Sequence, residues 1–147
     1  KGKVGKDLDT NAGYNAAKRC ALSIVAQVKK ACNNDLTKIK SCIKLTGFVN
    51  SSDDFVEQPK VINGASDLIA SVFGDAGMHT RAAVSTNSLP LGVSVEIDAI
   101  FEFALGVKMD GKPASSELEN KENDETAMEA DDAEEDKTEV TPDPTKP

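Results

Sequence analysis

The chain has no tryptophan, one tyrosine and one histidine among its 147 residues, and it lacks any apolar run of about 18 residues. The missing apolar run excludes a membrane-spanning helix, so we expect no membrane partner. The three cysteines, Cys20, Cys32 and Cys42, have neither the spacing of a zinc site nor that of a redox pair. We therefore expect no metal and no cofactor, and we place these thiols, reduced, in the core.

The odd number of cysteines also bears on the compartment. Disulfide frameworks are typical of secreted proteins and need paired cysteines. A reducing compartment is therefore favoured, and we expect the cytoplasm or the mitochondrion. The sequence begins at Lys1 rather than at a methionine, so it carries no information about a targeting signal.

Charge divides the chain into two parts. Residues 110–147 hold 14 Asp and Glu against 4 Lys, whereas residues 1–109 carry a net charge of +2. We expect a folded domain over residues 1–105 and a disordered acidic tail over residues 106–147, because the tail has few apolar residues to bury. The tail is either an arm that binds basic partners or a solvated extension without one. The nearly neutral domain lacks the basic surface that nucleic acid requires.

Two segments have the apolar spacing of amphipathic helices. The first runs from Tyr14 to about Asn33, and the second runs from about Phe55 to Phe73, with Gly74 as a C-terminal cap. The dipeptide Asn63-Gly64 is a turn signal inside the second segment. The apolar stripe continues in phase on both sides of this dipeptide, so we predict an uninterrupted helix.

Three segments are predicted to be strands. Residues 39–49 alternate between apolar and polar side chains, and so do residues 92–103, while residues 81–86 form a shorter strand-like run. The last two runs are joined by residues 87–91, which we interpret as the wide turn of a hairpin. The predicted fold class is α+β, with two helices on one face of a mainly antiparallel sheet.

Alternation along the hairpin places polar side chains on one face. If Val84, Val95 and Ile97 face the helices, the opposite face carries Arg81, Ala83, Glu96 and Asp98. One interpretation is a ligand cleft beside this face. The other is a cross-strand ion pair between Arg81 and a neighbouring carboxylate, which contributes about 0–1 kcal/mol on a solvated surface.

The chain contains a series of short motifs, which are Leu45–Asn50, Gln58–Leu68, Gly77, His79, Arg81, Leu89–Gly92 and Val95–Ile97. Together these motifs resemble the divergent branch of the YjgF/Rid family, whose members are described as chorismate mutase-like or endoribonuclease L-PSP-like. The resemblance covers about residues 2–103. It implies a chorismate mutase-like (YjgF) fold and a homotrimer with three ligand clefts between subunits. It also implies two upstream strands that this sequence lacks, with a tyrosine and a serine that line the cleft, so we expect an N-terminally truncated chain.

The resemblance implies an enamine/imine deaminase that hydrolyses reactive imino acids to 2-oxo acids and ammonia. Arg81 occupies the position that binds the carboxylate of the substrate, and Glu96 occupies the position of the catalytic glutamate. His79, Ala83 and Asp98 are cleft neighbours. Ala83 stands where many active members have cysteine, and His79 stands where proline or alanine is more usual.

Other functions remain open at this point. One is a non-catalytic trimer, either a sensor or chaperone-like, that binds a small carboxylate-bearing metabolite in the same cleft. Ribonuclease activity is suggested only by the family description, and the sequence supplies neither a pair of histidines nor a basic groove for it.

Overall fold

The computed structural model describes residues 1–104, which belong to the first of two compact units, Lys1–Gly111. The predicted acidic tail lies outside the described residues. Among residues 1–104, no helix has both the length and the apolar character that crossing a membrane requires.

The first helix, α1 (Thr10–Ala31), is capped by its neighbouring aspartate. The Asp9 carboxylate accepts a hydrogen bond of 2.6 Å from the backbone N–H of Ala12, which satisfies one of the free donors of the first turn. Ala17 and Ala21, one turn apart, are fully buried. The predicted helix is confirmed and begins at Thr10 rather than at Tyr14.

The second helix, α2 (Gln58–Phe73), packs closely against α1. Its first turn contains Pro59, and it ends at Gly74, whose φ of +58° is a backbone conformation that glycine tolerates well. The dipeptide Asn63-Gly64 stays helical, as predicted. A Cβ atom on Gly64 would lie 2.0 Å from the carbonyl oxygen of Tyr14, so this glycine is what lets the two helix backbones approach.

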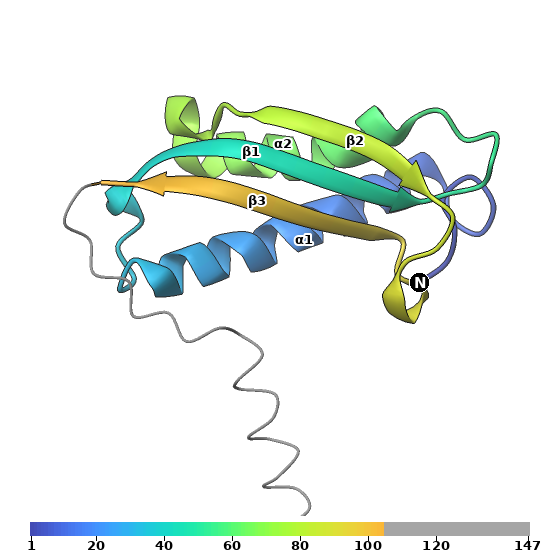
Figure 1. Ribbon diagram of the computed structural model, residues 1–147, viewed down its shortest axis with the longest axis horizontal. Helices are drawn as coiled ribbons and strands as arrows, with labels where there is room; N and C mark the ends of the chain where they lie inside the picture. Colours follow the sequence, from blue (N-terminus) through green and yellow to red (C-terminus); the bar gives the residue numbers. More distant parts are fainter. Residues whose placement is uncertain (105–147) are drawn as a thin grey trace, which may run out of the picture. The chain divides into compact units, whose positions relative to one another are not determined.

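The sheet has three strands, β1 (Ile39–Asn50), β2 (Thr80–Thr86) and β3 (Val95–Phe103), in the order β2-β1-β3 (Figure 1). β1 pairs with β2 in parallel and with β3 in antiparallel orientation. The predicted hairpin is therefore wrong, because β1 lies between its two arms. Parallel neighbours need a crossover connection, and α2 supplies it between β1 and β2.

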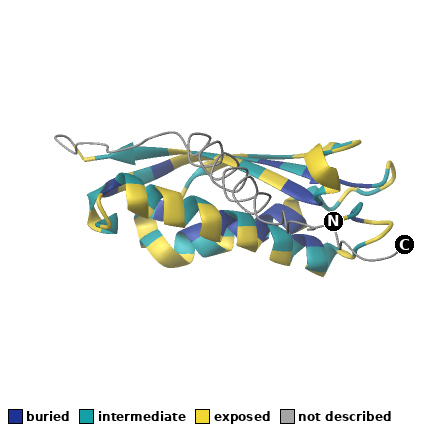
Figure 2. Ribbon diagram, turned by 90° about the horizontal axis from the view of Figure 1, so that it is seen from below, coloured by how far each residue is buried: buried dark blue, intermediate teal, exposed yellow. Residues whose placement is uncertain are grey.

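The α+β class is confirmed, with both helices on one face of a mixed sheet (Figure 2). Short 3-10 turns occupy Leu36–Lys38, Gly74–Gly77 and Pro90–Gly92. The core lies between the helices and the sheet. Its fully buried members include Val4, Ala17, Ala21, Leu45, Val49, Val61, Ile62, Ala65 and Ile69.

The cysteines follow the prediction in part. Cys32 and Cys42 are buried, Cys20 is half-buried, and all three are free thiols. Burial raises the pKa of the Cys20 and Cys42 thiols, which keeps them protonated and unreactive.

The predicted face is correct for β3 and wrong for β2. Val95 of β3 is buried in the core, as expected. On β2, however, Ala83 packs against the core and Val84 is 43% exposed, the reverse of the prediction. Three apolar residues in a row, Ala82 to Val84, give no period-two signal from which the buried side of an edge strand could be read.

Candidate functional site

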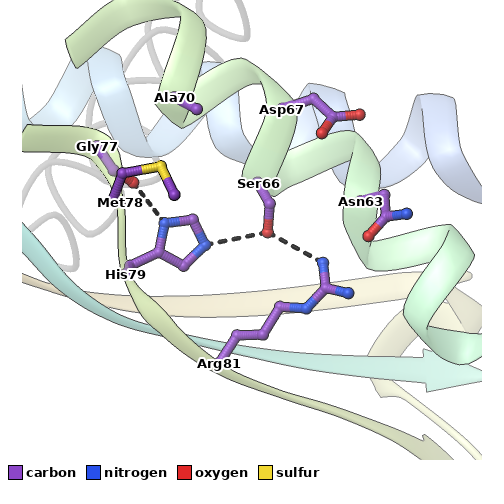
Figure 3. Close-up of a pocket in the computed structure, with 8 residues that line it drawn as sticks. All are labelled: Asn63, Ser66, Asp67, Ala70, Gly77, Met78, His79 and Arg81. Atoms are coloured by element: carbon purple, nitrogen blue, oxygen red, sulfur yellow. Dashed lines mark hydrogen bonds between the residues drawn. The ribbon is translucent and has the colours of Figure 1, made fainter. Parts of the chain in front are cut away.

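A pocket of about 340 Å³ lies between α2 and the beginning of β2 (Figure 3). Its volume is within the lower part of the range for small-molecule sites, which begins at about 300 Å³. Polar side chains from both elements converge on it. The lining residues are Asn63, Ser66, Asp67, Ala70, Gly77, Met78, His79 and Arg81.

One face of α2 supplies half of the lining. Asn63, Ser66, Asp67 and Ala70 follow the spacing i, i+3, i+4, i+7, which places them in one row along a helix. The apolar side of the same helix, including Ala65 and Ile69, is buried in the core. Within the polar row, Ser66 points toward His79 and Arg81 at the start of β2 (Figure 3).

The turn before β2 brings the other half into position. Gly77 is buried, and a Cβ atom there would lie 2.5 Å from the carbonyl oxygen of Ile69 on α2. Only glycine fits such a close approach without displacing backbone. His79 and Arg81 follow two residues apart, so their side chains leave the extended chain on the same side.

His79 is held between a backbone carbonyl and a serine hydroxyl. Its Nδ1 lies 2.6 Å from the carbonyl oxygen of Gly77, and its Nε2 lies 3.0 Å from Oγ of Ser66 (Figure 3). A carbonyl oxygen can only accept a hydrogen bond, so Nδ1 must carry a proton. In the neutral ring Nε2 is then the acceptor, and the Ser66 hydroxyl donates to it.

Arg81 reaches the same serine from β2. Its Nη1 donates to Oγ of Ser66 at 3.1 Å, and its Nη2 donates to the carbonyl oxygen of Pro59 at 3.3 Å. These two bonds leave three of the five guanidinium N–H donors for other partners. Within residues 1–104, no carboxylate lies within ion-pair distance of this exposed side chain.

Asp67 is tied to α1 by the single tyrosine. The Tyr14 hydroxyl donates a hydrogen bond of 2.9 Å to the Asp67 carboxylate. This bond raises the pKa of the Tyr14 phenol, because ionisation would remove the donor and place two negative charges side by side. The bond fixes one wall of the pocket to the neighbouring helix.

The structure separates the two residues that were predicted to act together. Arg81 pairs with Leu45 of β1, which is fully buried under the helices, so Arg81 leaves the sheet on the helix side. Glu96 pairs with Phe48, three residues farther along β1 and therefore on the opposite face. The prediction that they share a face is wrong.

The remaining predicted cleft residues divide in the same way. Asp98 pairs with Thr46 and lies, exposed, on the open face with Glu96. Ala83 lies on the helix side and packs against the core, while His79 lines the pocket beside Arg81. Of the five predicted site residues, only Arg81 and His79 line one pocket.

Sequence reasoning did not single out the α2 residues of the site. Ser66 links His79 to Arg81, and Asn63 and Asp67 lie in the same row. Their helical spacing was the available signal, since three polar residues and one alanine recur at i, i+3, i+4, i+7 beside a strand that carries a histidine and an arginine.

The chemistry open to this pocket is binding of an anion and transfer of a proton. Arg81 offers a fixed positive charge, and the Ser66–His79 pair offers a hydroxyl next to a basic nitrogen. Among residues 1–104, no three His, Cys, Asp or Glu side chains are grouped so that they could hold a metal ion.

The sequence of the chain matches a known protein family. The sequence model described as "YjgF/chorismate mutase-like, putative endoribonuclease" matches residues 1–103. The chain is 49% identical over 102 residues to Protein TCP17 of Trypanosoma cruzi. That match covers 69% of this chain and 63% of TCP17, so the chain spans less than two thirds of that relative.

Two solved structures are similar in both fold and sequence. A protein of unknown function from Agrobacterium tumefaciens is 57% identical with a TM-score of 0.70, over 71% of this chain and 66% of that one. A protein described as a "putative endoribonuclease" from Shewanella oneidensis MR-1 is 34% identical with a TM-score of 0.68, over 70% of this chain and 68% of its own.

Proposed function

This chain belongs to the YjgF/chorismate mutase-like family, and from that membership together with the position of Arg81 we propose that it acts as an enamine/imine deaminase. The substrate class is a small imino acid that carries a carboxylate, and the products are a 2-oxo acid and ammonia. The protein works as a homotrimer with its clefts between copies.

The observation that carries the proposal is the state of the Arg81 side chain. Its guanidinium is exposed at the pocket, is oriented by Ser66 and Pro59, and has no carboxylate partner among residues 1–104. A planar cation with free N–H donors is suited to bind a carboxylate through two parallel hydrogen bonds. Because the protein already holds this side chain in place, less side-chain entropy is lost when the carboxylate binds.

The second group of the reaction comes from another copy. Glu96 is exposed on the sheet face that no described helix covers, and Ile100 on the same face is 53% exposed. Because Arg81 and Glu96 leave one sheet in opposite directions, a cleft that contains both takes them from different copies. Exposed apolar side chains such as Ile100 on that face favour its burial against another chain.

The reaction needs only water as co-reactant. With the carboxylate of the substrate on Arg81, Glu96 takes a proton from a water molecule as its oxygen bonds to the imine carbon. The resulting carbinolamine holds both oxygen and nitrogen on that carbon. Glu96 returns this proton to the nitrogen, and the hydroxyl proton of the carbinolamine also passes to the nitrogen as the carbon–oxygen double bond forms. The carbon–nitrogen bond then breaks, and the 2-oxo acid and ammonia leave.

The experiment follows ammonia release from freshly generated 2-aminoacrylate with the wild-type chain, Arg81→Ala and Arg19→Ala. Arg19 is the other arginine of the sequence and is exposed on α1, so its removal changes the net charge equally. We expect the wild type and Arg19→Ala to accelerate ammonia release. In Arg81→Ala the rate should fall by about 10- to 100-fold, the usual cost of losing a charged hydrogen bond. If the wild type does not accelerate ammonia release, the proposal is rejected.

A binding-only trimer is the second candidate. It is favoured by the separation of Glu96 from the pocket within one chain, which leaves Arg81 without a carboxylate base beside it. Titration with pyruvate as a stable carboxylate separates the two functions. Binding that depends on Arg81, without any ammonia release by wild type, assigns the binding function.

A further inference from the structure

We propose that Ser66 is a nucleophile activated by His79, and that the pocket between α2 and β2 accepts the acyl group of a small ester. This activity is separate from imine hydrolysis. It uses the pocket of a single chain, and Glu96 has no part in it.

The arrangement of Ser66 and His79 is that of a nucleophile and its general base. Oγ of Ser66 lies 3.0 Å from Nε2 of the imidazole, within the distance at which a proton passes directly from one to the other. In the neutral ring with its proton on Nδ1, the serine hydroxyl is the donor of this bond. Both side chains are partly exposed and line the same pocket, so a substrate can reach the hydroxyl (Figure 3).

The carbonyl of Gly77 acts as the third member of the set. It accepts a hydrogen bond of 2.6 Å from Nδ1 of His79, which fixes the tautomer in which Nε2 is free to accept the proton of Ser66. When the ring becomes an imidazolium, the same bond is strengthened by the positive charge. The carbonyl therefore both orients the base and stabilises its protonated form.

Arg81 supplies the stabilisation of negative charge. Its Nη1 lies 3.1 Å from Oγ of Ser66, so a guanidinium N–H adjoins the atom where a bond to the substrate would form. The carbonyl oxygen of a bound ester acquires negative charge at that moment, and the guanidinium N–H donors that Ser66 and Pro59 leave free can bind it and lower the barrier. Met78, which is 70% exposed, adds apolar surface for the acyl chain.

The steps balance with water alone. Oγ of Ser66 forms a bond to the ester carbonyl carbon while Nε2 of His79 takes the hydroxyl proton. The carbon–oxygen bond of the ester breaks, and the departing alcohol takes the proton from Nε2. A water molecule then attacks the acyl-serine, passes its proton through His79 to Oγ, and releases the carboxylic acid.

A structural alternative makes a different prediction. If the hydrogen bonds only join α2 to β2, Ser66 reacts no faster than an ordinary serine on the same helix. Ser71 is such a residue, because it is exposed on α2 and its hydroxyl donates to the carbonyl of Leu68 at 2.7 Å rather than to a histidine.

The test treats the full chain with an alkyl fluorophosphonate, which phosphonylates activated serines, and maps the modified peptides by mass spectrometry. We expect a phosphonyl adduct on Ser66 and none on Ser71. In His79→Gln the side-chain amide can still hydrogen-bond Ser66 but cannot take its proton, so labelling should fall by about 100-fold or more, while Ser71→Ala labels Ser66 as wild type does.

The wild-type protein alone can overturn the proposal, so the result does not depend on how the variants fold. An unmodified Ser66, or equal labelling of Ser66 and Ser71, rejects the nucleophile. If His79→Gln labels Ser66 as strongly as the wild type does, the role of His79 as the general base is rejected. None of these outcomes bears on ammonia release from 2-aminoacrylate, which tests the deaminase separately.

Discussion

Arg81 and Glu96 project from opposite faces of the same sheet, since Arg81 pairs with Leu45 on the buried side of β1 and Glu96 pairs with Phe48 on the open side. No change of side-chain rotamer can bring them into one cleft within a single chain, because the backbone of β1 separates them. Any function that uses both residues is a function of an assembly.

Mixed assemblies of two inactive variants should therefore recover deaminase activity. Arg81→Ala and Glu96→Gln are each expected to lose most of the activity. In randomly mixed trimers, about a quarter of the clefts receive both an intact arginine from one copy and an intact glutamate from another. The measurement is ammonia release after the two variants are refolded together.

The control for the mixing experiment is each variant refolded alone at the same total concentration. Recovery well above the sum of the two controls supports a shared cleft. A mixture that is no more active than this sum contradicts the assignment of Arg81 and Glu96 to one cleft between copies.

Gly64→Ala should destabilise the fold although alanine is the better helix former. The exchange gains roughly 1 kcal/mol of helix propensity. Its Cβ atom, however, would lie 2.0 Å from the Tyr14 carbonyl oxygen, which is backbone and cannot move aside alone. Separating α1 from α2 costs about 1–3 kcal/mol or more, as overpacking does elsewhere.

Urea unfolding measures this effect as a shift of the midpoint. Ser71→Ala is the matched control, since it places alanine at an exposed position on the same helix and should leave the midpoint nearly unchanged or raise it slightly. If Gly64→Ala were as stable as the wild type, the close approach of the two helices would not be what requires glycine.

Asp67→Ala should lower the pKa of Tyr14. The hydrogen bond to Asp67 raises this pKa from the usual value of 10.0, and its removal returns the phenol toward that value. Absorbance of the phenolate follows the titration without interference, because the chain has no tryptophan and no second tyrosine. Asp75→Ala, which removes an exposed carboxylate beyond the end of α2, should leave the titration unchanged.

The same bond makes a contribution to stability that depends on pH. A pKa that is raised in the folded state favours folding below the unfolded pKa of about 10, and this contribution is lost as the pH rises through the folded value. The free energies of unfolding of wild type and Asp67→Ala, measured across a range of pH, should therefore become equal at high pH. A difference in free energy of unfolding that stays constant across this pH range would show that the Tyr14–Asp67 bond makes no such contribution.

Local patterns predicted the elements well and their pairing poorly. The helices and β1 have long apolar periodicities, so their position and buried sides could be read from the sequence. Strand pairing depends on which segments meet in space. The helix between β1 and β2 was the sign of a parallel crossover, but the short connection before β3 favoured a hairpin.

The candidate site shows the same limit. Arg81 was recognised from the family resemblance, whereas the available signal for Ser66 was its place in the polar row with Asn63 and Asp67 on α2. Its contact with His79 exists because Gly77 lets the turn before β2 lie against α2, and such an approach depends on backbone geometry rather than on residue pattern. The contact with Ser66, together with the bond to the carbonyl of Gly77, holds the His79 ring in one orientation.

The crossover through α2 also decides how local in sequence the contacts of the pocket are. All residues that line the pocket fall between Asn63 and Arg81, within one continuous segment that docks on β1. Closing this loop costs somewhat less chain entropy than closing the longer loop that brings in β3, by about 0.6 kcal/mol for each doubling of length. The contacts that build the pocket are therefore more local in sequence than the contacts that add β3 to the sheet.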